Sequence, residues 1–145
     1  MSNHLYIVGI DGSEWSERAA AKAFELAKDT GAHIKLIYVM NYSVSSPMLM
    51  DGVVPPPVNY KEEEKGIHAQ VITPLTEQYK DSGVAFESEI IWGEPVELLR
   101  DKIKSERAHM VFVGRRGRSR IADIIVGSIA NKLAHCVGVP IVLVP

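Results

Sequence analysis

Five short runs of apolar residues, rich in isoleucine and valine, limit the possible folds of this chain more than any other feature. The runs are LYIVGI at 5–10, HIKLIYVM at 33–40, VAFESEII at 84–91, HMVFVG at 109–114 and VPIVLV at 139–144. Each has the length and side chains typical of a strand. Only the third alternates cleanly between two faces, and the others are apolar almost throughout. Such runs are typical of a parallel sheet that is covered on both faces.

The segments between these runs have the periodicity of helices. Residues 13–30, 94–107 and 128–137 each carry an apolar stripe. Residues 59–82 are also predicted to be helical, but Pro74 lacks a main-chain donor and should kink or divide this helix. Strand and helix therefore alternate along the chain. With right-handed crossovers, this order predicts an open, Rossmann-like α/β fold with a five-stranded parallel sheet, strand order 3-2-1-4-5, and helices on both faces.

Size and composition indicate one domain that spans residues 1–145. The chain is 46% hydrophobic and 23% charged, and its formal net charge of -2 gives no overall attraction to nucleic acid. No apolar run approaches the roughly 20 residues of a membrane span, and no signal peptide is evident, so we expect a cytoplasmic protein. Cys136 cannot form an internal disulfide and is expected to pack as an apolar residue. Residues 43–57 are predicted to be a connection after the second strand.

The predicted topology brings two distant strand ends to one crevice. In a 3-2-1-4-5 sheet, ligands bind where the first and fourth strands are neighbours, at their carboxyl ends. The first strand ends at Asp11 and the fourth at Gly114, which opens the stretch GRRGRSRIADIIVGS. Glycines there let main-chain amides approach an anion, and a helix that starts at Ser128 adds unpaired N–H donors. The stretch predicts a polyphosphate site, although a glycine-rich connection that binds nothing has the same spacing.

The chain resembles the universal stress protein family, whose members have UspA-like domains. The resemblance runs from IVGIDGSEWSERAAAKAFELA in the first strand and helix to the final VPIVLV. It is most specific at the ATP-binding pattern G-x2-G-x9-G-[ST], which Gly114, Gly117, Gly127 and Ser128 fulfil. It implies the adenine nucleotide alpha hydrolase-like fold and ATP as the ligand, with AMP or ADP as alternatives and Mg²⁺ or Mn²⁺ on the phosphates. It also implies a homodimer joined through residues 139–144 and an unknown regulatory protein partner.

Carried over position by position, the resemblance implies a complete nucleotide site. The adenine would lie near Ile10 and Asp11 and against the backbone of Val39, and the ribose near Asp11 and Gly114. The phosphates would lie on residues of the glycine-rich stretch and the next helix, which are Gly117, Gly127, Ser128 and the amide of Ile129.

Four arginines lie within or beside the glycine-rich stretch. Arg115 and Arg116 stand where the family often has small or polar residues, and Arg116 is included among the candidate phosphate ligands. Arg118 and Arg120 are candidates for a further phosphate contact. We expect no more than one or two of the four to touch phosphate.

Two other functions are compatible with these residues. Asp11 with a divalent metal would serve a nucleotide hydrolase or transferase, and residues 115–120 would serve a nucleic-acid contact. The chain lacks a P-loop and a G-x-G-x-x-G motif, and its five histidines are scattered without zinc-site spacing. The resemblance therefore implies a nucleotide-dependent regulatory module in the stress response, and the missing motifs favour slow ATP hydrolysis at most.

Overall fold

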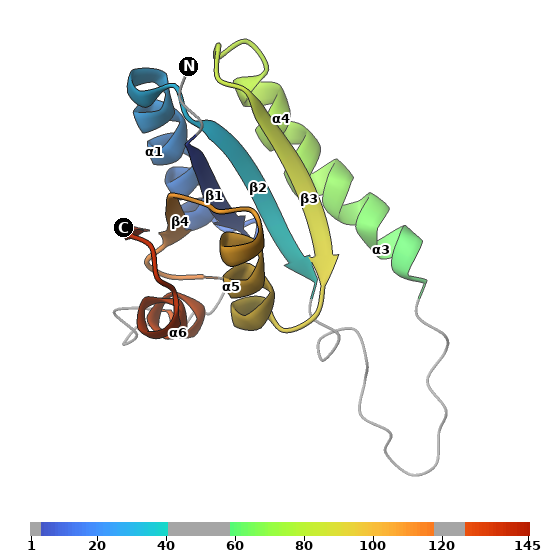
Figure 1. The fold of residues 1–145 in the computed structure, drawn as a ribbon. Helices are drawn as coiled ribbons and strands as arrows, with labels where there is room; N and C mark the ends of the chain where they lie inside the picture. The colour runs from blue at the N-terminus through green and yellow to red at the C-terminus, as the bar shows by residue number, and fades with distance from the viewer. Residues whose placement is uncertain (1–3, 41–58, 118–126) are drawn as a thin grey trace.

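A five-stranded parallel sheet forms the centre of the molecule (Figure 1). The computed structural model describes residues 4–40, 59–117 and 127–145. The strands, in chain order, are β1 (Leu5–Ile10), β2 (His33–Met40), β3 (Phe86–Trp92), β4 (Met110–Gly114) and β5 (Ile141–Val144). Their order across the sheet is β3-β2-β1-β4-β5, and every neighbouring pair is parallel. The predicted fold class is confirmed.

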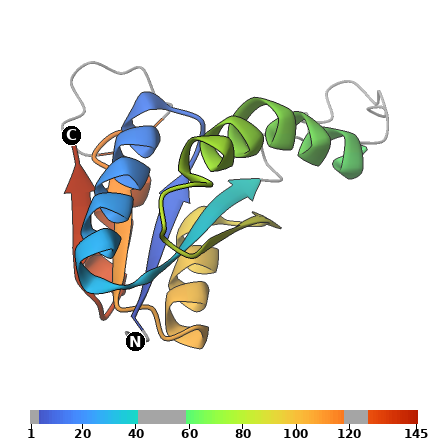
Figure 2. The same cartoon turned by 90° about the horizontal axis from the view of Figure 1, so that it is seen from above.

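Helices pack on both faces of this sheet. They are α1 (Glu14–Thr30), α3 (Tyr60–Ile67), α4 (Thr73–Tyr79), α5 (Pro95–Ser105) and α6 (Ser128–Cys136), and a π-helical segment, η1 (His68–Ile72), joins α3 to α4. The segment from α3 to α4 lies on the same side of the sheet as α1, and α5 and α6 lie on the other side (Figures 1 and 2).

Two apolar cores explain why the strand sequences are apolar almost throughout. Along β1, Tyr6 and Val8 belong to the core beneath α1 and α4, whereas Ile7 belongs to the core beneath α5 and α6. Because successive side chains of a strand point to opposite faces, a sheet covered on both sides needs apolar residues at every position. The edge strand β3 is the exception, since Glu87 and Ser88 are exposed.

Pro74 produces a single wide helical turn. Proline cannot donate the hydrogen bond that would bind its own amide to the carbonyl of Gln70. Just before it, the amide of Thr73 donates to the carbonyl of His68, a five-residue step that defines η1. The helix predicted for residues 59–82 is therefore divided, as expected, and the division takes the form of a π-helical turn.

The ends of α1 follow the sequence signals. The Ser13 side chain accepts a hydrogen bond from the amide of Ser16, and Gly31 ends the helix in the left-handed conformation with φ of 75°. The expectation for Cys136 is wrong, because this residue is exposed at the end of α6. None of the helices among the described residues has the length and apolar character needed to span a bilayer.

Candidate functional site

A pocket of about 400 Å³ lies at the carboxyl ends of the central strands. Every residue predicted for the nucleotide site lines it, including Ile10 at the end of β1, Asp11 directly after it and Val39 in β2. The remaining predicted residues in its lining are Gly114, Arg116, Gly117, Gly127, Ser128 and Ile129. Residues 43–57, Arg118 and Arg120 lie outside the described residues. The structure thus brings the predicted residues together, and their binding of a nucleotide remains a prediction.

One end of the pocket is apolar. Its wall contains residues from β2, β4, α3 and α5 that sequence reasoning did not assign to the site: Ile37, Met40, Ile67, Pro95, Leu99 and Val113. An apolar wall suits the flat ring of a base.

The main chain of Val39 offers an acceptor at this apolar end. In β2, odd-numbered residues such as His33 direct their main-chain groups toward β1, and even-numbered residues such as Ile34 direct them toward β3. The ladder with β1 ends where Ile10 pairs with Tyr38. The carbonyl of Val39 therefore points into the space beyond the end of β1, where the pocket lies.

Asp11 presents one carboxylate oxygen to the connection between β4 and α6. Its Oδ1 accepts hydrogen bonds from the amide of Ser13 at 2.9 Å and from the Ser13 hydroxyl at 2.5 Å. Its Oδ2 lies 3.1 Å from the position that a Cβ atom on Gly117 would occupy. A side chain at position 117 would therefore press on this carboxylate, which explains the glycine.

The glycines at 114 and 127 have different roles from the one at 117. A Cβ at Gly114 would lie 2.7 Å from the Cβ of Trp15, so this glycine allows α1 to pack closely on β4. The amide of Gly127 donates to the carbonyl of Arg115 at 2.6 Å. The amide of Gly127 is therefore already paired within the protein. What Gly127 gives the pocket is the space left by its missing side chain.

The amino terminus of α6 provides N–H donors that have no partner among the described residues. The side chains of Ser13, Asn59 and Glu94 cap α1, α3 and α5, whereas α6 has no side-chain cap. The first main-chain bond within α6 runs from Asn131 to the carbonyl of Gly127 at 2.9 Å. The N–H groups of its first turn consequently have no partner within the helix. The residues that carry them, Ser128, Ile129 and Ala130, all line the pocket.

Arg116 is the cationic side chain of this lining within the described part of the chain, and Asp11 is its anionic counterpart. The Nε atom of Arg116 is buried, and no hydrogen-bond partner for it is found among the described residues. A buried Nε without a partner is stabilised by an anion beside it. The Nε of Arg115 is also buried without such a partner, but Arg115 does not line the pocket. The positive group and the first turn of α6 belong to the same pocket, and together they suit a phosphate.

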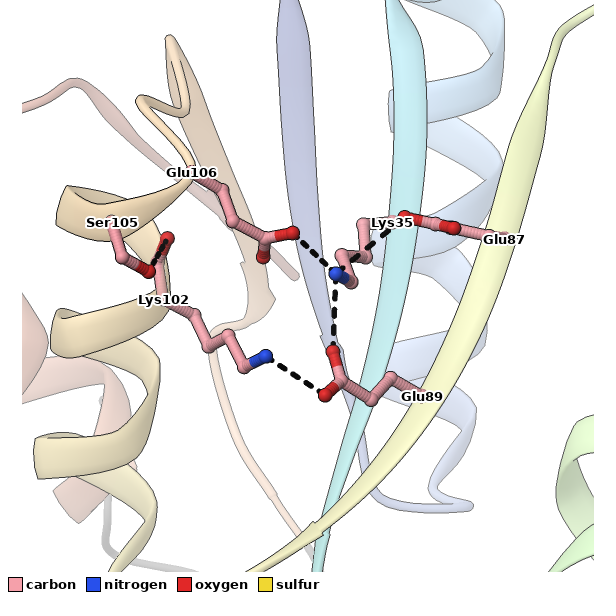
Figure 3. A network of polar contacts seen from close by, with 6 residues as sticks. All are labelled: Lys35, Glu87, Glu89, Lys102, Ser105 and Glu106. Atoms are coloured by element: carbon pink, nitrogen blue, oxygen red, sulfur yellow. Dashed lines mark hydrogen bonds and ion pairs between the residues drawn. The ribbon is translucent and has the colours of Figure 1, made fainter.

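A second polar cluster joins α5 to the face of the sheet (Figure 3). The ammonium of Lys35, on β2, contacts Glu106 and lies 3.1 Å from Glu89 and 3.5 Å from Glu87. Lys102 lies 2.8 Å from Glu89. Burial alone would lower the pKa of Lys35, but its contacts with Glu106 and Glu89 outweigh burial and raise this pKa well above its ordinary value.

The pKa of Glu89 is shifted in the complementary direction. Burial alone would raise it, but contacts with Lys102 and Lys35 lower it below its ordinary value. Lys35 has a Cα partner in Ile7 of β1, so the cluster lies toward the amino ends of the strands, away from the pocket. The cluster binds the last turn of α5 to the sheet, while the first turns of α5 contribute to the wall of the pocket.

Comparison with known proteins gives a family. The chain is 26% identical over 142 residues to the universal stress protein YxiE of Bacillus subtilis, covering 95% of this chain and 96% of YxiE. A universal stress protein solved in complex with cAMP has a TM-score of 0.71 and 21% identity, covering 99% of this chain and 98% of that one. The universal stress protein of Archaeoglobus fulgidus in complex with dAMP has a TM-score of 0.68 and 16% identity, covering 99% and 98%. Since the model of the universal stress protein family matches residues 6–145, the chain belongs to that family.

Proposed function

We propose that this universal stress protein binds an adenine nucleotide in the pocket between β1, β4 and α6, and that occupancy of the pocket regulates its interaction with a protein partner. The observation that carries the proposal is the uncapped first turn of α6, which lines the same pocket as an apolar wall. A nucleotide needs both features, because its base is flat and apolar while its phosphates are anionic.

Adenine fits the apolar end better than guanine does. The carbonyl of Val39 accepts a hydrogen bond from the exocyclic amine of adenine, whereas guanine has a carbonyl at the corresponding position and would repel it. The family members solved with cAMP and dAMP, both adenine nucleotides, support this choice.

The phosphates fit the opposite end. The amides of Ser128, Ile129 and Ala130 and the hydroxyl of Ser128 donate to phosphate oxygens, and Arg116 supplies a positive charge. We propose ATP as the ligand, with AMP and ADP as alternatives. The Oδ2 of Asp11, which has no hydrogen-bond donor among the described residues, suits Mg²⁺ or Mn²⁺, since Mg²⁺ commonly binds one or two carboxylates together with phosphates and water. The bound metal would neutralise phosphate charge.

The lining favours binding over turnover. It includes no histidine, cysteine or lysine within the described residues, and one oxygen of Asp11 is occupied by Ser13. Efficient phosphoryl transfer requires a group that positions the nucleophile and several that stabilise the transition state. We therefore propose that any hydrolysis is slow.

The proposed homodimer rests on the outer edge of β5. This strand pairs with β4 on one side, and Leu143 on it is 36% exposed. An apolar edge strand favours pairing with another strand, and a second copy supplies one of equal length. Light scattering at micromolar concentration is expected to give the mass of a dimer, and the mass of a monomer would contradict this part of the proposal.

Isothermal titration calorimetry tests the nucleotide proposal. ATP, AMP, adenosine and GTP are titrated separately into the purified protein with Mg²⁺ present. We expect ATP and AMP to bind more tightly than adenosine, because the phosphate end adds donors, and more tightly than GTP, because of the Val39 carbonyl. Equal affinity for ATP and GTP would contradict the base assignment, and absence of binding by all four would contradict the function.

A further inference from the structure

The helix α3 is less buried than the helical segment that follows it. None of its residues, Tyr60 to Ile67, is buried, whereas the segment that follows buries Ile72 in η1 and Leu75 in α4. In Figure 2, α3 extends past the carboxyl end of β2. Because helices in proteins are stabilised mainly by the packing of an apolar face, α3 should open at a lower free energy than α4.

The connection between α3 and α4 contains a π-helical turn and is preceded by a glycine. The wide π-helical turn η1 lies between them, and such turns are frequent at functional sites. Gly66 precedes this turn, and a Cβ atom there would meet no other atom within 4 Å, so packing does not require the glycine. A glycine within a helix lowers the stability of that helix. Gly66 and η1 together form a natural hinge between the anchored α4 and the exposed α3.

A specific contact holds α3 against the end of β3. The indole N–H of Trp92, the last residue of β3, donates to the carboxylate of Glu64 at 2.6 Å. The ring of Tyr60 meets the Trp92 ring edge to face, with centroids 4.6 Å apart. Trp92 is also the strand partner of Met40, which lines the pocket. The contact therefore lies next to the apolar wall of the base end.

One residue of α3 reaches the pocket itself. Ile67, the last residue of the helix, belongs to the apolar end of the lining, although it is distant in sequence from the strand ends. A base in the pocket would cover Ile67 and gain apolar contact with it. Binding and the closed position of α3 would then stabilise each other, because a ligand favours the state in which it makes more contacts.

We propose that α3 is a cover over the base end of the pocket, hinged at η1 and held by the Glu64–Trp92 contact, and that a bound nucleotide orders it. This inference rests on the proposed function and adds its regulation. Occupancy of the pocket then changes the order of the outer surface of α3, which carries the charged side chains of Lys61, Glu62 and Lys65. A protein partner that binds this surface would distinguish the nucleotide-bound protein from the nucleotide-free one.

Hydrogen exchange with mass spectrometry tests the proposal on the full-length protein, with and without saturating ATP and Mg²⁺. Calorimetry on the same sample establishes whether ATP binds. Without ATP, the amides of residues 60–67 should exchange at least about ten-fold faster than those of 73–79, and ATP should slow the first set at least about ten-fold. If ATP binds and the exchange of residues 60–67 does not change, the cover is refuted and the nucleotide site stands. If ATP does not bind, both fail.

Two substitutions of Glu64 distinguish loss of its contact with Trp92 from a general loss of structure. Glu64→Leu removes the acceptor of the Trp92 N–H, whereas Glu64→Gln keeps an acceptor oxygen at the same position. Glu64→Leu should weaken ATP binding about five-fold, the factor that corresponds to one net hydrogen bond, and should increase the exchange of residues 60–67. Glu64→Gln and the exposed control Lys65→Ala should stay near wild type. Equal affinity of Glu64→Leu and wild type would refute the role of the contact.

Discussion

Replacing Gly127 with aspartate should separate the stability of the fold from its ability to bind an anion. Gly127 is the cap residue of α6, with φ of -62° and ψ of 153°, a conformation that any residue can adopt. A Cβ there would lie 3.4 Å from the amide nitrogen of Gly117 and 3.5 Å from the carbonyl of Arg115, which is ordinary contact. The aspartate carboxylate can therefore cap the first turn of α6 itself.

The two effects of Gly127→Asp have opposite signs. Aspartate as a cap improves on glycine by a few tenths of a kcal/mol, and its charge at the helix amino terminus adds about 0.3–1 kcal/mol. The same carboxylate would occupy the donors proposed for phosphate and repel it, by about 4 kcal/mol for unit charges about 4 Å apart at an effective dielectric constant of about 20. Even half of that repulsion weakens binding about 30-fold.

Calorimetry for ATP and urea denaturation measure both effects. We expect Gly127→Asp to unfold at the same or a higher urea concentration and to bind ATP at least about 30-fold more weakly. Gly127→Ala controls for the side chain without charge, and Gly138→Asp places the same charge beyond the other end of α6, where a Cβ meets nothing within 4 Å. Wild-type affinity of Gly127→Asp would refute the assignment of the phosphate site to α6.

Three further predictions concern the residues around the pocket and the Lys35 cluster. Arg116→Met should weaken AMP and ATP binding by about ten-fold or more and leave adenosine binding unchanged in calorimetry, because the proposed phosphate would pair with the arginine side chain, whose buried Nε has no partner among the described residues; equal losses for all three ligands would contradict a phosphate role. Gly114→Ala should lower the free energy of unfolding by about 1–3 kcal/mol in urea titrations, because the new Cβ would lie 2.7 Å from the Cβ of Trp15; unchanged stability would show that α1 shifts freely. Lys35→Met should cost about 1–3 kcal/mol near neutral pH, because the partly exposed carboxylates of Glu89 and Glu106 lose their partner. The pKa of Glu89 is lowered in the folded protein, so its contribution is present above its ordinary pKa of about 4.3 and is lost as the pH falls through the lowered value. Urea titrations from pH 7 to pH 3 should therefore show wild type losing more stability than Lys35→Met on acidification, and parallel pH profiles would contradict the role of the cluster.

The sheet and the position of the pocket could be predicted because both follow from local patterns. Apolar runs such as HIKLIYVM specify buried parallel strands, and the order of strands and helices limits the topology to a few arrangements. The strand ends Asp11 and Gly114 then meet in the pocket. The glycine-rich stretch could be assigned to the pocket because glycines followed by a helix start form a local signal.

The parts that could not be predicted depend on distant contacts. Ile67 reaches the pocket because η1 and α4 carry α3 across the end of the sheet, which no periodicity in residues 59–82 reveals. Lys35 is buried in a strand because carboxylates far along the chain surround it. Glycine is needed at position 114 because α1 packs closely there, whereas the sequence pattern assigned this glycine to the ligand site.

The exposure of Cys136 could not be predicted from the sequence either. The residue lies in the last turn of α6, and the apolar stripe of a short helix does not reveal how much of that turn the sheet covers. Composition favours burial of a cysteine only on average.

Amide chemical shifts of the ¹⁵N-labelled protein, recorded by NMR during a titration with ATP and Mg²⁺, test the central claim most directly. The amides of Ser128, Ile129 and Ala130 are the donors expected to meet phosphate. We predict that these three amides shift strongly and to saturation, and that residues near Val39 shift with them. ATP binding that leaves these three amides unshifted, or no binding at all, would contradict the account.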